Sequence, residues 1–212
     1  MEKKRKVIFS AEDVSDWSSL SRDSVFIAIF GALWGLVEIT LGVVIKGIRL
    51  PMGGALLVAI CSIIFLTGRF FIRRRGSILM MGGIAAILKI FSVGTVIAGP
   101  FIAILIESLI AEALISILGI HRFSYVMTAS ALSVYTILHP FISQGIIFGE
   151  NIYKIYLETF QKITQLLQLD FRYVVWIILI YVFLHLILGA ASGWLAYSLA
   201  LRVKKEFSIN SN

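Results

Sequence analysis

Residues 25–45, VFIAIFGALWGLVEITLGVVI, form an uninterrupted apolar stretch that contains one formal charge, Glu38. At about 1.5 Å of rise per residue, a helix of this length covers roughly 30 Å, which is the thickness of the hydrocarbon core of a bilayer. The stretch therefore predicts a transmembrane helix that carries a carboxylate inside the membrane.

One face of this helix is nearly bare of side chains. When residues are placed about 100° apart, five small residues fall on the same side, namely Ala28, Gly31, Ala32, Gly35 and Gly42. Small residues let a second helix approach closely in lipid, where helices associate by packing and not by hydrophobic force. The face therefore predicts a docking surface for another helix, and it leaves open whether that helix belongs to a different protein or to a second copy of this chain.

The composition of the whole chain is typical of an integral membrane protein. Of its 212 residues, 59% are hydrophobic and 15% are charged, and its mean hydropathy is +0.96. A soluble domain carries charge on nearer a quarter of its residues. The net charge of +7 indicates a rim that faces anionic lipid, and we expect no nucleic-acid partner. The single Cys61 lies in an apolar run, which excludes an intrachain disulfide and a Cys-based metal cluster.

Six apolar runs predict an all-α membrane protein with six transmembrane helices. The expected spans are residues 25–45, 52–68, 77–93, 101–118, 124–148 and 173–201. We expect one membrane domain over residues 25–205, a polar N-terminal tail over 1–24 and a C-terminal tail over 206–212. A kink is expected at His139-Pro140 in the fifth span.

The segment between the fifth and sixth spans has a different pattern. In residues 150–172 apolar side chains recur at helical spacing and polar side chains occupy the positions between them. This pattern predicts an amphipathic helix that lies on the outer membrane surface or over a pocket, because the segment is too polar to span a bilayer.

Six spans place both termini on the same side of the membrane. If that side is the cytoplasm, most of the 19 Lys and Arg residues fall in cytoplasmic segments, as the positive-inside rule requires. The sequence therefore predicts a multi-pass protein of the cell membrane with both termini in the cytoplasm.

Six ionisable residues lie within the expected spans, where insertion of each costs about 2.5–3.5 kcal/mol and needs a reason. They are Glu38, Lys89, Glu107, Glu112, His139 and His185. Most of them fall from the middle of the membrane outward, where a pocket open to the outside would lie. We expect some of these groups to contact a polar solute. The alternatives are that Lys89 pairs with Glu38 or Glu107 and only neutralises the core, or that the groups form a proton path.

Two of the six are expected to have other roles. Glu112 lies on the cytoplasmic side of the middle, and we expect it to serve helix packing or contact with a partner. His185 lies on an aromatic-rich helix and is expected to pack there.

The sequence has no catalytic motif. H-E-x-x-H, G-x-S-x-G and G-x-x-x-x-G-K-[ST] are absent, and no Asp lies within a span. Glu107, His139 and His185 could in principle bind a metal, but three isolated residues on three helices are a weak indication. We therefore expect no enzyme, no metal site and no cofactor. A homo-oligomeric channel and an assembly or regulatory membrane protein are the alternatives to a solute-binding protein.

The pattern resembles the substrate-binding membrane subunits, or S components, of energy-coupling factor transporters, which take up vitamins and metal ions. Many members carry A-x-x-x-A on the first helix, and AIFGA at residues 28–32 matches this motif at the expected place. Family members commonly have six helices and cytoplasmic termini, and they bind substrate near the outer face. The resemblance implies docking through Ala28 and Ala32 on a transmembrane coupling subunit, and we expect the neighbouring Gly31 and Gly35 to share that interface.

The resemblance also implies what the chain does. It would bind a vitamin-like small molecule with high affinity, and two partner ATPases would drive its release inside the cell. We expect Lys89 to contact an anionic group of the solute, while Glu38, Glu107 and His139 orient it. If the solute is a cation, the carboxylates become its counter-ions and Lys89 is structural.

Overall fold

The computed structural model describes residues 11–48, 52–72, 74–91, 98–142 and 173–209, with the single residues Asn151, Lys154, Leu157, Gln161 and Gln165. Its helices are α1 (Ala11–Gly47), α2 (Gly53–Phe71), α3 (Ser77–Ile90), α4 (Ala98–Leu118), α5 (Arg122–Phe141) and α7 (Val174–Ile209). No strand occurs in these residues, so the all-α prediction is confirmed for them. The amphipathic segment predicted at 150–172 lies outside the described residues, apart from the single positions.

Four of the helices are long and apolar enough to cross a membrane. They contain the segments Arg22–Ile45, Gly53–Phe71, Gly99–Leu118 and Val175–Glu206. Helix α3 is also apolar but has only 14 residues, and α5 is not one of the four. The described helices therefore indicate a multi-pass membrane protein, and four of the six predicted spans meet the criteria of length and hydropathy.

Helix α1 begins well before the apolar run that predicted it. It starts at Ala11, so the second half of the predicted polar tail is helical. Residues 11–30 contain no Gly and no Pro, and a helix extends readily once a nucleus exists because each further residue adds a hydrogen bond. The apolar run accounts for the membrane segment, and the absence of helix-breaking residues accounts for the extension.

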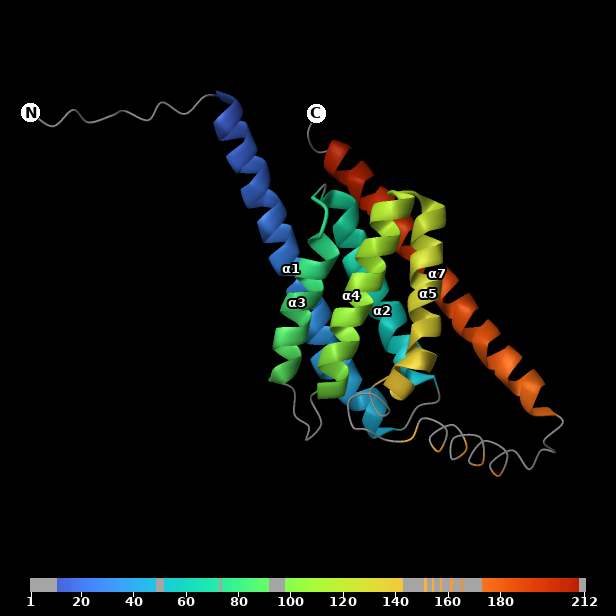
Figure 1. Cartoon of the computed structure of the whole chain (residues 1–212). Helices are drawn as coiled ribbons and strands as arrows, with labels where there is room; N and C mark the ends of the chain where they lie inside the picture. The colour runs from blue at the N-terminus through green and yellow to red at the C-terminus, as the bar shows by residue number, and fades with distance from the viewer. Residues whose placement is uncertain are drawn as a thin grey trace, which may run out of the picture.

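Figure 1 shows the helices as one bundle in which α2 lies centrally and contacts α1, α3, α5 and α7. Helix α3 packs between α1 and α4, and α5 pairs with α7. Successive helices run in opposite directions, so the start of α1 and the end of α7 lie at the same end of the bundle. The first half of α7 extends obliquely away from the other helices, and most of its large apolar side chains are exposed.

Aromatic packing fixes the position of α1 on α2. Trp34 is fully buried, and its ring lies 4.6 Å from that of Phe65, centroid to centroid. Such aromatic pairs add to the stabilisation that burial already provides. Glu38 follows Trp34 by one helical turn and therefore shares its inward face, which brings a carboxylate into the interior of the bundle.

Candidate functional site

A cavity of about 320 Å³ lies at the end of the bundle opposite the start of α1 and the end of α7. Because the helices alternate in direction, the second halves of α1, α3 and α5 meet the first halves of α2, α4 and α7 there. The wall of the cavity holds five ionisable side chains: Glu38, Lys89, Glu107, His139 and His185. All four residues that we expected to contact a solute thus line one cavity, although they come from four different helices.

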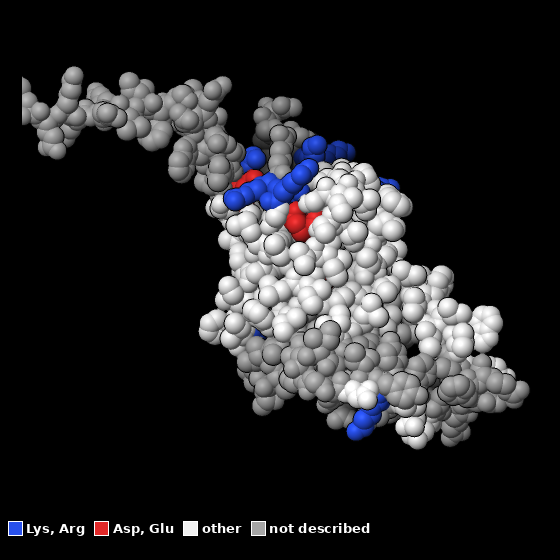
Figure 2. All heavy atoms as spheres, viewed as in Figure 1, with Lys and Arg blue, Asp and Glu red and all other residues white. Residues whose placement is uncertain are grey.

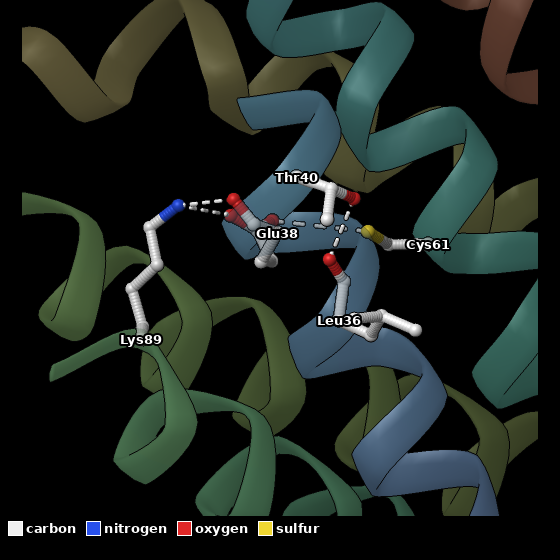
Figure 3. A network of polar contacts seen from close by, with 5 residues as sticks. All are labelled: Leu36, Glu38, Thr40, Cys61 and Lys89. Carbon is white, nitrogen blue, oxygen red and sulfur yellow. Dashed lines mark hydrogen bonds and ion pairs between the residues drawn. The ribbon is translucent and has the colours of Figure 1, made fainter. Parts of the chain in front are cut away.

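Two of these residues form a buried ion pair, shown in Figure 3. The Nζ atom of Lys89 lies 3.3 Å from Oε2 of Glu38 and also donates a hydrogen bond to the backbone carbonyl of Glu38. Cys61 donates from Sγ to the other carboxylate oxygen, Oε1, over 3.7 Å. Of the two pairings that the sequence left open for Lys89, the structure therefore shows the one with Glu38.

Gly42 provides the space that this pair needs. A Cβ atom at Gly42 would lie 3.0 Å from Nζ of Lys89 and 3.8 Å from Oε2 of Glu38. A contact of 3.0 Å is tighter than most Cβ contacts, so a larger residue at 42 would push Nζ of Lys89 aside by a few tenths of an ångström. Gly42 is one of the five small residues that predicted a docking face, and its role here lies inside the chain.

Glu107 on α4 differs from Glu38 in having no partner among the residues that the structure describes. Its side chain is buried, with 5% of the residue exposed, and it lines the cavity. Within the described ranges no hydrogen bond and no ion pair reaches its carboxylate. A buried carboxylate is costly unless it is paired or hydrogen-bonded, so this group points to something that occupies the cavity.

The two histidines are held by their own helices. Nδ1 of His139 lies 3.3 Å from the hydroxyl oxygen of Tyr135, and Nδ1 of His185 lies 2.8 Å from the carbonyl oxygen of Tyr181. A carbonyl can only accept, so Nδ1 of His185 is assigned the proton, and Nε2 of the neutral ring is then an acceptor. The ring of His185 also packs at 4.3 Å from that of Tyr181, as expected for this aromatic-rich helix.

Sequence reasoning gave His185 a packing role only, yet it also lines the cavity with Tyr181. The feature of the sequence that could have assigned His185 to the site is its expected depth in the membrane. In the spans expected from the sequence, His185 falls near the middle of the membrane, as Glu107 and His139 do. Depth alone does not show which way a side chain faces, because this depends on how each helix is rotated.

The small residues on one face of α1 lie in two different environments. Gly31 and Gly35 are buried against α3: a Cβ atom at Gly31 would lie 3.0 Å from the carbonyl oxygen of Met81, and one at Gly35 would lie 2.7 Å from Cδ1 of Leu88. The expectation that these two glycines dock a partner is corrected here, because α3 of the same chain occupies that surface. Ala28 and Ala32 are exposed.

Glu112 has a structural role at the opposite end of the bundle. Its Oε1 accepts from the backbone N–H of Gly76 at 2.7 Å, its Oε2 accepts from the N–H of Ile78 at 2.9 Å, and Ser116 donates to Oε1. These two N–H groups lie at the start of α3, where a helix has no internal acceptors for them. Glu112 therefore caps α3, which is the helix-packing alternative of the two expected for it.

Glu107, His139 and His185 do not assemble into a metal-binding group. Among the described residues, no set of three or more His, Cys, Asp or Glu side chains is arranged to hold an ion. The cavity has the size of the smaller small-molecule sites, which start at roughly 300 Å³. Its dimensions and its buried polar groups suit a small polar solute.

We compared the chain with protein-family models, with curated proteins and with solved structures, and none of the three comparisons found a match.

Proposed function

We propose that this chain is the solute-binding membrane subunit of an energy-coupling factor type uptake transporter for a vitamin-like small molecule. The observation that carries the proposal is the cavity at one end of the bundle, lined by buried ionisable groups from several helices. Ionisable groups inside a membrane protein mark solute or ion pathways more often than they serve packing.

The distribution of charge supports an outward-facing cavity. Most of the exposed basic side chains in the described residues gather at the end opposite the cavity, as Figure 2 shows. They are Arg22, Arg74, Arg75, Arg122, Arg202, Lys204 and Lys205. Under the positive-inside rule this end faces the cytoplasm, with both termini, and the cavity then opens to the outside.

Uptake against a gradient needs an energy source outside this chain. The sequence contains no Walker motif, and a ligand shifts an equilibrium only by its differential affinity for two states. We therefore propose a transmembrane coupling subunit and two ATPase subunits as partners. Ala28 and Ala32, with the exposed Ile29, Leu33 and Leu36 beside them, offer the coupling subunit a helix face that no described helix covers.

An assembly or regulatory protein is the main alternative, and a homo-oligomeric channel is another. An assembly protein would have its polar groups paired among themselves and would leave no cavity. The Glu38–Lys89 pair agrees with that alternative, but the cavity and the unpaired Glu107 within the described ranges favour solute binding.

The proposal is tested by native mass spectrometry of the full chain, purified in mild detergent from its own source. We expect the wild type to retain a small molecule and to bring with it a membrane subunit and ATPases that carry Walker motifs. The double variant Ala28→Leu/Ala32→Leu should lose the subunits and keep the small molecule. Ala113→Leu, at an exposed alanine on α4, is the matched control and should keep both.

Two results would contradict the proposal. A wild-type chain that carries no small molecule and associates only with copies of itself indicates a channel or an assembly protein. If the double variant keeps the ATPases as well as the Ala113 control does, the coupling subunit docks elsewhere.

A further inference from the structure

The only cation described in the wall of the cavity is already neutralised. Lys89 is 5% exposed, and both its contact with the Glu38 carboxylate and its hydrogen bond to the Glu38 carbonyl are internal. An anionic solute would have to draw Lys89 away from Glu38 and leave a buried carboxylate unpaired, which typically costs about 3–5 kcal/mol. Lys89 is therefore a poor attachment point for an anion, contrary to our first expectation.

Glu107 then leaves the wall with one carboxylate in excess. It is buried, it borders the cavity, and within the described part of the chain it has neither a donor nor a counter-ion. The described groups around it do not compensate for it, because Lys89 is already paired with Glu38. A ligand that brings positive charge or N–H donors to this position supplies the counter-ion and the hydrogen-bond donors that the carboxylate of Glu107 lacks.

Two of the neighbouring polar groups are also acceptors, the imidazole of His185 and the backbone carbonyl of Thr136. When the ring of His185 is neutral and Nδ1 donates to the carbonyl of Tyr181, Nε2 is an acceptor. Pro140 has no N–H, so the carbonyl of Thr136, four residues earlier and also at the cavity, loses its usual helical donor. The aromatic ring of Tyr181 adds an electron-rich surface that attracts cations.

We propose that the cavity binds a small organic cation, such as a protonated amine or a positively charged nitrogen heterocycle, with Glu107 as its counter-ion. The size of the cavity and the lack of three metal-ligating side chains together among the described residues favour an organic cation over a metal ion. This inference rests on the proposed solute-binding function and names the class of solute.

The test uses three probes that share one ring and differ in charge: benzylamine, benzyl alcohol and benzoate. Binding of each to the full chain in lipid nanodiscs is measured by saturation-transfer NMR and by the shift of the thermal unfolding midpoint. We expect benzylamine to bind at least about tenfold more tightly than benzyl alcohol, since a charge-assisted hydrogen bond contributes about 1.5–3 kcal/mol, and benzoate to bind weakest.

Variants identify the counter-ion. Glu107→Gln keeps the shape and hydrogen-bonding capacity of the side chain but carries no charge, so the preference for benzylamine over benzyl alcohol should disappear. Glu206→Gln removes an exposed carboxylate at the far end of α7 and should leave the preference unchanged. The comparison of the three probes on the wild type needs no variant, so the test does not depend on the folding of Glu107→Gln.

The remaining outcomes separate this inference from the proposed function. Stronger binding of benzoate that is lost in Lys89→Met, or equal binding of all three probes, overturns the cation inference and leaves solute binding in place. A preference for benzylamine that persists in Glu107→Gln overturns the role of Glu107. If none of the three probes binds, the result counts against the cation inference and against solute binding alike.

Discussion

At the scale of single residues, the Glu38–Lys89 pair shows how two charges persist inside an apolar bundle. Each carboxylate oxygen of Glu38 has a partner, since Oε2 faces Lys89 and Oε1 accepts from Cys61. The ammonium group has a second acceptor in the carbonyl of Glu38. The pair is thus a neutral unit with most of its hydrogen-bonding groups satisfied, which is the condition under which buried charges are tolerated.

Breaking this pair from either side should destabilise the fold. Lys89→Met and Glu38→Gln should each lower the free energy of unfolding by about 3–5 kcal/mol, because each leaves one buried charge unpaired. The double variant should lose less than the sum of the two, because it buries no charge. Chemical unfolding in mixed micelles measures all three.

The control for the pair is Lys204→Met, which removes an exposed Lys on α7 and should change stability by no more than about 0.5 kcal/mol. If Lys89→Met has wild-type stability, the pair is not a structural unit. Lys89 would then again be a candidate for contact with the solute.

Most ionisable residues of the cavity could be predicted from the sequence, because an ionisable side chain within an apolar run costs free energy to insert into a membrane and is therefore easy to recognise. Glu38, Lys89, Glu107 and His139 stand out in apolar runs, and each has to face the interior. The partner of Lys89 could not be predicted, because it depends on the rotation of α1 against α3 and on the clearance at Gly42. Rotation is fixed by packing between helices, which no single run of sequence encodes.

At the scale of helices, glycines set how closely neighbours approach. A Cβ atom at Gly189 of α7 would lie 2.5 Å from the carbonyl oxygen of Ala129 on α5, and one at Gly193 would lie 2.3 Å from that of Tyr125. The two glycines are four residues apart, the spacing that lets membrane helices pack backbone to backbone. Sequence reasoning missed this pair and assigned the equivalent pair on α1 to an external partner.

A methyl group at this interface should be costly. Gly193→Ala places a side chain on backbone atoms of α5 that cannot rotate away, so we expect the variant to lose about 1–3 kcal/mol of stability through overpacking. Gly83→Ala on α3 is the matched control: a Cβ there meets open space, and the better helix propensity of Ala should leave stability unchanged or raise it by up to about 1 kcal/mol. Thermal unfolding of both variants in the same detergent measures the difference. Equal effects of the two substitutions would show that α5 and α7 do not pack through Gly193.

The helices were predictable to different degrees. Apolar runs gave α2 and α4 within a few residues, because burial in lipid requires an unbroken run. Helix α5 is harder to recognise as a span, since the buried Ser124, Thr128 and Ser133 lower its hydropathy. These hydroxyl groups are buried inside the protein and do not face lipid, and hydropathy along the chain does not separate the two environments.

At the scale of the whole molecule, the directions of the helices constrain how the chain crosses the membrane. Helices α2, α4 and α7 all run from the cavity end toward the end that holds both termini. Between them the chain has to return twice, and α3 and α5 make these returns. Although α3 covers only about 21 Å at 1.5 Å per residue, we propose that this path crosses the membrane six times with its basic end in the cytoplasm.

Cysteine labelling in intact cells tests both the orientation and the crossing by α3. Native Cys61 is fully buried and should stay silent toward a membrane-impermeant maleimide. Gly47→Cys at the end of α1 and Phe91→Cys after α3, both at exposed positions, should react from outside, whereas Arg75→Cys between α2 and α3 should react only after permeabilisation.

Reaction of Arg75→Cys alone in intact cells would invert the orientation and place the cavity on the cytoplasmic side, which would exclude capture from outside. If Gly47→Cys reacts from outside while Phe91→Cys requires permeabilisation, α3 does not cross the membrane. The placement of Lys89 in the wall of the cavity would then be wrong.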